Sequence, residues 1–382
     1  MTNSASNEAK RSTAGNLILP VAGLLAVIGI ACWVVQLIVG PSVLADTIPW
    51  GVYIAAFFLL AGAGSGLVMM AAAGDWGILP ALKDWRRSLL IGAAASYIAA
   101  GFMILLDLGQ PVRIYNFFVS PNFTSMFVWD FLFLLATVVL VLICFFRKEA
   151  SKWLLGLTAV TALGIVLIEG WILAVNPVTV WNSALIPVVF LVEAIVVAAA
   201  VLLAAKGDAF ESLKKILIGL LPLLLIFSLI EMFAGNYMGA SQEAAGTKLL
   251  LTGSLAPFYW GWVVLGVALP FVLLLWKGTS AGAVKLAAVL AVCGVLLAKI
   301  NLLVAGQALP FEGGTIGYFP SIVEIGGMLG GLGLAVFLFV LGKNFFGDAP
   351  TAVEASAEAE EAKAPAEAET EAEAETPAQD EA

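Results

Sequence analysis

Polar side chains gather where one long apolar stretch of the sequence ends. The segment Asp107-Leu-Gly-Gln-Pro-Val-Arg113 supplies a carboxylate, an amide and a guanidinium, and Pro111 within it stops a helix. Asp130 follows close to the start of the next apolar stretch. Such groups are costly at the border of a membrane span unless they contact something polar. This segment is therefore the first candidate for a functional site.

Further ionisable residues fall within or at the ends of other apolar stretches. They are Glu169, Glu193, Glu231, Lys299 and Glu324. Each would cost about 2.5–3.5 kcal/mol at the centre of an inserted helix, so each requires a partner or water. Glu193 falls near the middle of its stretch and the others fall in one half of theirs, which predicts a polar cavity open to one side.

More than one interpretation of these residues stays open. Lys299 and one of the glutamates can form a structural ion pair between spans, and Asp130 can anchor a helix end beside Trp129. Alternatively, Glu193, Glu231 and Lys299 are candidates for handling protons, since ionisable groups inside a membrane often mark proton or ion pathways.

The elements that carry these residues are membrane-spanning helices. The 382 residues are 62% hydrophobic and 12% charged, and the mean hydropathy is +1.03. Stretches of about 20 apolar residues predict an all-α, polytopic membrane protein with about ten spans. The predicted spans are 17–39, 51–73, 88–108, 125–146, 153–175, 183–205, 214–235, 257–276, 283–305 and 321–342. They form a membrane domain over 17–346, between an N-terminal tail at 1–16 and a C-terminal tail at 347–382.

Composition excludes several classes of function. The chain has no histidine, which excludes haem held between spans by axial histidines. Cys32, Cys144 and Cys293 match no zinc or iron–sulfur spacing, so we expect no metal site. Eleven of the 27 acidic residues lie after residue 348, where an Ala/Glu-rich tail is predicted to be disordered. The membrane body is close to neutral, and we expect no nucleic-acid partner.

The basic residues predict the orientation. With alternating spans, only Arg113 and Lys248 fall in connections on one side, whereas the connections on the other side carry most of the lysines and arginines. The positive-inside rule then places both termini in the cytoplasm and the Asp107–Asp130 segment outside. The expected location is the cytoplasmic (inner) membrane.

Several motifs together resemble one family. Trp50-Gly51 followed by Gly62-Ala-Gly64-Ser65-Gly66, the Asp107-Leu-Gly-x-Pro-x-Arg113 segment and Trp181-Asn182 with Pro187 are similar to signatures of the polysulfide reductase membrane subunit family, also called NrfD/PsrC. The match covers most of residues 45–205, whereas 206–342 fits mainly by the number of spans. The resemblance implies two four-helix bundles, roughly 51–175 and 183–305, with two peripheral helices.

The resemblance also implies a function. Members of the family are non-autonomous subunits without haem or metal that bind a quinone, menaquinone or ubiquinone, near the outer face. They exchange electrons with a ferredoxin-like iron–sulfur subunit docked outside, which serves a molybdopterin-type or other catalytic subunit. An ion or solute transporter that uses the buried carboxylates and Lys299 is the alternative, and a purely structural anchor is a third possibility.

On this hypothesis Asp107 exchanges the quinol proton, and Arg113 either keeps that carboxylate ionised or pairs with the docked subunit. Trp50 and Tyr53 are expected to form one wall and one hydrogen-bond donor. The remaining polar residues predicted around the quinone are Gln110, Asn122, Asp130 and Asn182. One departure concerns the fifth span, where the family's tyrosine is replaced by Ile168-Glu169-Gly170-Trp171, so Glu169 or Trp171 must substitute or the site lies slightly elsewhere.

Overall fold

The structure is a computed structural model of an all-helical protein. It describes residues 2–40, 48–108, 110–147, 151–178, 180–206, 211–237, 241–276, 278–309 and 317–346. These residues contain no β-strand, and ten of their helices are long and apolar enough to cross a membrane. The predicted fold class and number of spans are confirmed. The predicted C-terminal tail lies outside the described residues.

The long helices match the predicted spans to within a few residues, except where helices extend past the apolar stretch. Their bounds are α1 Thr2–Val39, α2 Val52–Asp75, α3 Arg86–Asp107, α5 Met126–Phe146, α6 Lys152–Ala174, α7 Ile186–Lys206, α8 Glu211–Tyr237, α12 Ala281–Gln307 and α13 Ile322–Phe346. The eighth span joins α10 Ala256–Gly261, a π-helical segment Trp262–Ala268 and α11 Leu269–Leu275. Short helical pieces are η2 Pro80–Trp85, η3 Pro111–Tyr115, α4 Asn116–Val119 and α9 Ser241–Leu251.

Local sequence signals explain where several of these helices begin. Ser151 and Ser280 are N-caps whose side chains accept hydrogen bonds from the backbone N–H of Leu154 and Ala283, at 3.2 and 3.3 Å. Helix α3 ends at Asp107 and Pro111 opens η3. The proline ring suits the first turn of a helix, and its missing N–H prevents α3 from continuing.

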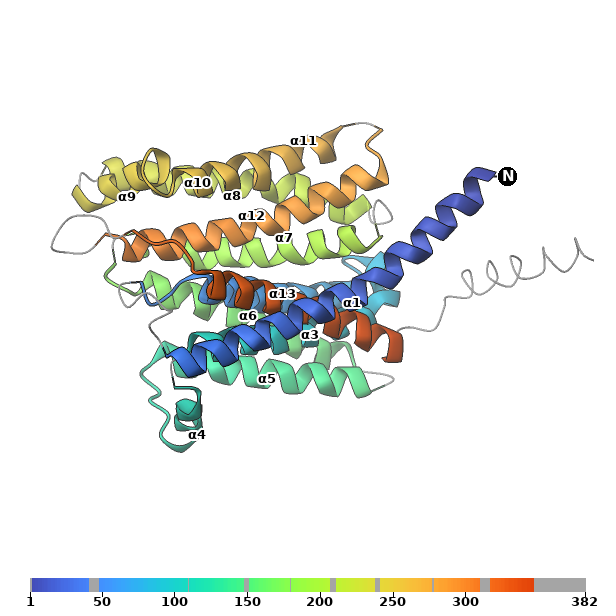
Figure 1. Cartoon of the computed structure of the whole chain (residues 1–382), viewed down its shortest axis with the longest axis horizontal. Helices are drawn as coiled ribbons and strands as arrows, with labels where there is room; N and C mark the ends of the chain where they lie inside the picture. Colours follow the sequence, from blue (N-terminus) through green and yellow to red (C-terminus); the bar gives the residue numbers. More distant parts are fainter. Residues whose placement is uncertain are drawn as a thin grey trace, which may run out of the picture.

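The spans pack as two bundles and a peripheral pair (Figure 1). Helices α2, α3, α5 and α6 form the first bundle, and α7, α8, the α10–α11 span and α12 form the second. Helices α1 and α13 pack along each other, and α13 rests on α3 and α2. This arrangement has the two four-helix bundles and two peripheral helices that the family resemblance implies.

Helix α2 lies at the junction of the two bundles and is almost completely buried. A Cβ atom on Gly66 would come within 2.2 Å of the Ala194 carbonyl oxygen of α7, so only glycine permits this approach. The small residues of the Gly62–Gly66 segment therefore serve helix packing between the bundles.

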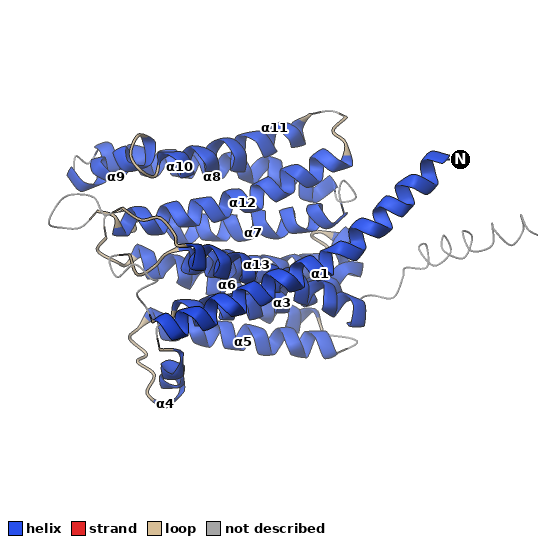
Figure 2. Ribbon diagram, in the orientation of Figure 1, coloured by secondary structure: helices blue, strands red, loops and turns tan. Residues whose placement is uncertain are grey.

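The two ends of the bundle differ in their connections and in charge. The end that carries Trp50 and Asp107, here called the Trp50 end, has the longer loops together with α4 and α9 (Figure 2). The opposite end is called the Lys343 end after the basic residue in the last turn of α13. Most basic residues in the described ranges lie at the Lys343 end, namely Lys83, Arg86, Arg87, Arg147, Lys152, Lys214, Lys215, Lys285 and Lys343.

Candidate functional site

A cavity of about 300 Å³ opens within the first bundle at the Trp50 end. Its walls come from α2, α3, the η3–α4 segment, α5 and α6, and they are mainly aromatic and aliphatic. The lining residues are Trp50, Ile54, Phe57, Phe58, Gly101, Ile104, Asp107, Leu108, Ile114, Phe117, Phe127, Asp130, Phe131, Leu134 and Ile172. Apolar walls with a few convergent polar groups are typical of small-molecule sites.

Two carboxylates supply the ionisable groups of this cavity. Asp107 is the last residue of α3 and is partly buried, while Asp130 is the fifth residue of α5 and is 9% exposed. The Oδ1 atom of Asp130 has no hydrogen-bond partner among the described residues. A buried polar atom without a partner is costly, so this oxygen is suited to accept a hydrogen bond or a proton from a ligand.

Trp50 forms the wall of the cavity that faces the second bundle. Its indole stacks on Trp181 at a centroid distance of 5.5 Å and an interplanar angle of 17°, and Phe127 meets it edge-on at 5.8 Å. The Trp181 indole N–H donates to the Leu302 carbonyl oxygen at 2.8 Å. The two tryptophans that precede the first helix of each bundle therefore meet at the junction of the bundles.

The backbone of Trp50 is held by a side chain that the sequence patterns did not indicate. The Trp50 N–H donates to Gln307 Oε1 at 3.0 Å, and Gln307 Nε2 donates to the Trp50 carbonyl oxygen at 2.9 Å. Gln307 ends α12, 257 residues further along the sequence. No local pattern around Gln307 indicates this contact, because the contact depends on how the second bundle docks on the first.

A second group behind Trp50 comes from the start of α13. Ser321 and Glu324 form a reciprocal capping box, in which Ser321 N–H donates to Glu324 Oε2 at 2.7 Å and Glu324 N–H donates to Ser321 Oγ at 3.1 Å. The Tyr318 hydroxyl donates to Glu324 Oε1 at 3.0 Å and accepts the Val52 N–H at 3.3 Å. Burial and the Glu324 carboxylate raise the pKa of Tyr318, so its hydroxyl stays a donor. The Ser-x-x-Glu pattern was a signal in the sequence for the capping box.

Tyr53 does not take the predicted place in the cavity wall. Its hydroxyl instead donates to the Val323 carbonyl oxygen of α13 at 3.2 Å. The prediction assumed that Trp50 and Tyr53 share one face of a helix, but α2 begins at Val52 and Trp50 lies before it. Residues on the two sides of a helix start do not follow helical spacing, so Trp50 faces the cavity and Tyr53 faces the peripheral pair.

The other predicted polar residues at this end lie on its surface and do not line the cavity. Gln110, Arg113, Asn122 and Asn182 are all exposed. Asn122 accepts from the Thr124 N–H and hydroxyl at 3.1 and 2.7 Å, and Asn182 donates to the Asn176 carbonyl oxygen at 3.2 Å. Within the described residues Arg113 forms no ion pair with Asp107.

Glu169, one of the two residues considered as a substitute for the expected tyrosine, is fully buried next to the cavity without lining it. Neither of its carboxylate oxygens has a hydrogen-bond partner in the described part of the protein. Trp171 is 47% exposed on the outside of the bundle, and Ile172 is the α6 residue that reaches the cavity. Neither residue considered as a substitute for the tyrosine therefore contacts the space that a ligand would fill.

Lys299 and Glu193 form the buried ion pair that was one of the open interpretations. The Lys299 ammonium lies 2.7 Å from Glu193 Oε2 and over the Phe190 ring, and both charged residues are at least 95% buried. The pair joins α12 to α7, and Glu169 lines the same narrow cavity from α6. A row of charged side chains thus runs from the first bundle into the second.

The second bundle contains its own cavity of about 160 Å³, which is mainly apolar but carries a few polar side chains. Glu231 and Glu193 line it, and Ser183 donates a short hydrogen bond to Glu231. Asn301, which no sequence motif singled out, also lines it, and both polar atoms of its amide are without a partner among the described residues. No group of three or more potential metal ligands occurs in the described ranges.

The fold and the cavity define a multi-pass integral membrane protein with an acidic, aromatic-lined site at one end of its first bundle. A family model described as "Polysulphide reductase, NrfD" matches residues 42–310. The protein therefore belongs to the NrfD polysulphide reductase family, and the match covers both bundles.

Curated relatives agree with this family. The sequence is 29% identical to a putative dimethyl sulfoxide reductase membrane subunit of Halobacterium salinarum, over 77% of this chain and 78% of the relative. It is 27% identical to the Hdr-like menaquinol oxidoreductase integral membrane subunit of Archaeoglobus fulgidus, over 90% of this chain and 95% of the relative. It is 28% identical to a polysulfide reductase polypeptide of Wolinella succinogenes, over 69% of this chain and 95% of the relative.

Proposed function

We propose that this protein is the quinone-reactive membrane subunit of a respiratory oxidoreductase, with its quinone site in the cavity of the first bundle. The observation that carries the proposal is that Asp107 and Asp130 both line a cavity that is otherwise aromatic and aliphatic. The names of the relatives, which include a menaquinol oxidoreductase subunit, support it.

The residues of the cavity fit a quinone by their chemistry. The aromatic walls suit the ring and an isoprenoid tail. The two carboxylates can accept hydrogen bonds from the hydroxyl groups of a quinol, and a protonated carboxyl can donate to a carbonyl oxygen of the quinone. Oxidation of a quinol releases two electrons and two protons, and reduction of the quinone takes up two electrons and two protons. The unpartnered Oδ1 of Asp130 is the kind of acceptor that a quinol hydroxyl can satisfy. Asp107, at the end of α3, exchanges the second proton with the water at the Trp50 end.

The Trp50 end is proposed to face outward and to dock the iron–sulfur subunit. The predominance of basic side chains at the Lys343 end supports this orientation and cytoplasmic termini. Arg113, Gln110, Asn122 and Asn182 then belong to an exposed polar surface beside the cavity, where Arg113 can pair with an acidic group of the partner. A further catalytic subunit of the molybdopterin or another type completes the proposed complex.

Glu193, Lys299 and Glu231 are proposed to handle protons in the second bundle. Their support is the row of buried charges that runs from Glu169 to the Lys299–Glu193 pair. It continues to the cavity of the second bundle, where Asn301 and Glu231 are polar lining residues. Glu231 hydrogen-bonds Ser183 near the Trp50 end, which provides an exit on the same side as Asp107. We therefore expect proton exchange with one side of the membrane.

Quinol turnover by the purified complex tests the proposal. We expect a stoichiometric quinone and an iron–sulfur partner in the preparation, and a loss of turnover in Asp107→Asn with normal assembly. Normal turnover in both Asp107→Asn and Asp130→Asn would show that the quinone does not react in this cavity. The transporter alternative is favoured by the buried charges of the second bundle, and it predicts uptake of a solute into liposomes by the isolated protein without quinone or partner.

A further inference from the structure

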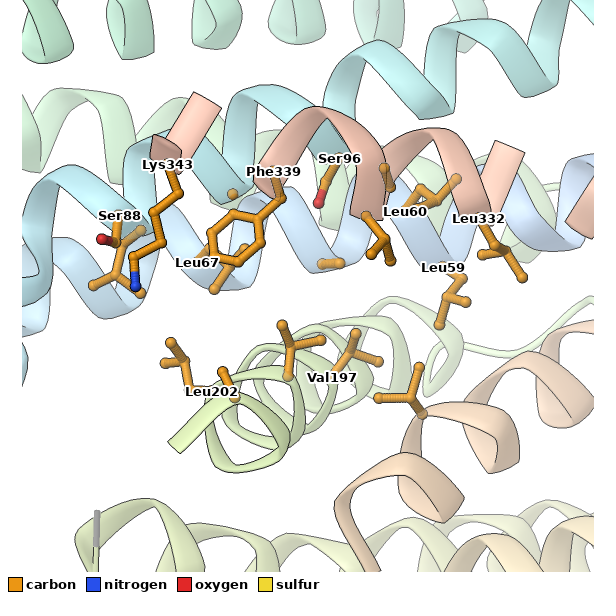
Figure 3. Close-up of a pocket in the computed structure, with 18 of the residues that line it drawn as sticks. Leu59, Leu60, Leu67, Ser88, Ser96, Val197, Leu202, Leu332, Phe339 and Lys343 are labelled. Carbon is orange, nitrogen blue, oxygen red and sulfur yellow. The ribbon is translucent and has the colours of Figure 1, made fainter. Parts of the chain in front are cut away.

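A separate crevice of about 350 Å³ lies between the two bundles and α13, toward the Lys343 end (Figure 3). One wall is formed by α13, the opposite wall by α7 and α12, and the floor by α2 and α3. None of the residues assigned to the quinone site or to proton handling lines it. The crevice is therefore independent of the proposed function.

The crevice opens sideways, toward the space that lipid occupies. Val336 of α13 is 45% exposed and Val201 of α7 is 37% exposed, and both lie on its lining. Cys293 of α12, a third lining residue, is exposed as well. Because α13 packs against α1, α3 and α2, its remaining side leaves this opening between itself and the second bundle.

The crevice runs from the middle of the membrane to the Lys343 end. Its residues on α13 extend from Leu332, near the centre of that helix, to Lys343 in the last turn. Eleven residues of helix rise about 16 Å, which is close to half of the roughly 30 Å hydrocarbon core of a bilayer. The residues on α3 and α7 come from the halves of those helices that face the same end. The crevice thus spans one leaflet.

Polarity in the crevice is concentrated at one end. Trp85, Ser88 and Lys343 line its end at the membrane border, and Ser96 is the one further polar residue on its lining. Figure 3 shows the Lys343 side chain extending from α13 at the same end as Ser88, with Phe339, Leu67 and Leu332 following along the crevice. The Lys343 ammonium lies 5.3 Å from the centre of the Trp85 ring, and it has no carboxylate partner within the described residues.

We propose that this crevice binds one acyl chain of an anionic phospholipid, with the phosphate headgroup at Lys343. Its length, its opening to lipid and its single cationic end match an amphiphile of one leaflet. Lipid tails are as apolar as the side chains that line the crevice, so the tail alone gives little preference for one lipid over another. Selection of a particular lipid therefore comes from the ammonium of Lys343 and its neighbours at the membrane border.

The test measures lipid retained by the full-length protein, in its complex, after transfer into nanodiscs that mix phosphatidylglycerol with phosphatidylcholine. Mass spectrometry of the intact protein counts retained phospholipid, and extraction separates phospholipid from quinone. We expect wild type to retain phosphatidylglycerol in preference to phosphatidylcholine. Lys343→Gln should reduce this preference about fivefold, because the attraction between one lysine and an anionic lipid surface changes the binding affinity by about that factor. Lys285→Gln, an exposed lysine at the same end but outside the crevice, should change nothing.

A second variant fills the crevice. Ala335→Phe places a ring in the space next to Phe339 and should abolish retention, whereas Ala136→Phe adds the same ring on the exposed side of α5 and should leave retention intact. Retention of quinone in place of phospholipid would overturn the proposal. Equal retention in Lys343→Gln and wild type would overturn it too, and that measurement stands even if Ala335→Phe fails to fold.

Discussion

Gln307 and Trp50 hold each other through two hydrogen bonds, one in each direction between the side-chain amide and the backbone of the tryptophan. Trp50 precedes the first helix of the first bundle, and Gln307 ends the last helix of the second. The wall of the candidate quinone site is therefore positioned by the opposite bundle, and a change in bundle docking would move the wall.

Replacing Gln307 should make the position of Trp50 less fixed, although Gln307 itself does not line the cavity. Gln307→Leu removes both hydrogen bonds to the Trp50 backbone, which is partly buried, at a cost of about 1 kcal/mol for each bond. We expect a lower unfolding temperature in detergent and a raised KM for quinol. Asn344→Leu, an exposed amide at the opposite end, is the matched control. An unchanged KM in Gln307→Leu would show that the clamp does not position the site.

Asp107→Asn should lower quinol turnover by a factor of about 10²–10⁴, the usual contribution of a general acid or base. The amide keeps the size of the side chain but cannot accept a proton, so assembly should be normal. Asp107→Glu should restore part of the rate. Asp84→Asn changes an exposed carboxylate at the opposite end and serves as the control. Turnover near the wild-type level in Asp107→Asn would assign proton exchange to another group.

Asp130→Leu should separate stability from function. The change removes a buried carboxylate with an unpartnered oxygen, so the protein should become more stable by about 1–3 kcal/mol. Quinol turnover should fall at the same time, because the proposed acceptor is gone. Thermal unfolding and turnover of the same preparation check both parts. A less stable protein would indicate that Asp130 has a structural partner outside the described residues.

Arg113→Ala is expected to weaken docking and to leave the chemistry unchanged. The side chain is exposed and forms no described ion pair with Asp107, which favours pairing with the docked subunit over control of the carboxylate. The affinity for the iron–sulfur subunit should fall, and its dependence on salt should weaken, since exposed charges steer association. Lys83→Ala at the opposite end is the control. A lower rate of quinol turnover by Arg113→Ala in the fully assembled complex would show instead that Arg113 takes part in the reaction.

The Lys299–Glu193 pair should show strong coupling. Lys299→Met leaves Glu193 as a buried charge without its partner, and we expect a loss of about 3–5 kcal/mol of stability. The double variant Glu193→Leu/Lys299→Met should recover most of that loss, because both charges are removed together. If the double variant is stable but changes the proton yield per quinol in vesicles, the pair handles protons. A wild-type proton yield would make its role structural.

The residues singled out by motif differ in where the fold places them. Asp107 and Trp50, from two separate motifs, line the same space as Asp130. Tyr53 lies on another face, because helical spacing does not continue across the start of α2. Gln110, Asn122 and Asn182 follow the same motifs but lie on the surface, as neither composition nor spacing tells which way a loop side chain points.

The sequence by itself determined the number of spans, the all-helical fold, the clustering of polar residues at one end and the absence of histidine ligands. These properties depend on local composition and length, because a lipid environment requires about 20 apolar residues and internally satisfied backbone groups in each span. The tertiary structure alone decided that Gln307 holds Trp50, that Lys299 pairs with Glu193, and that a crevice separates α13 from α7 and α12. Such contacts join residues from different helices, and their distances depend on how the two bundles and the peripheral pair pack together.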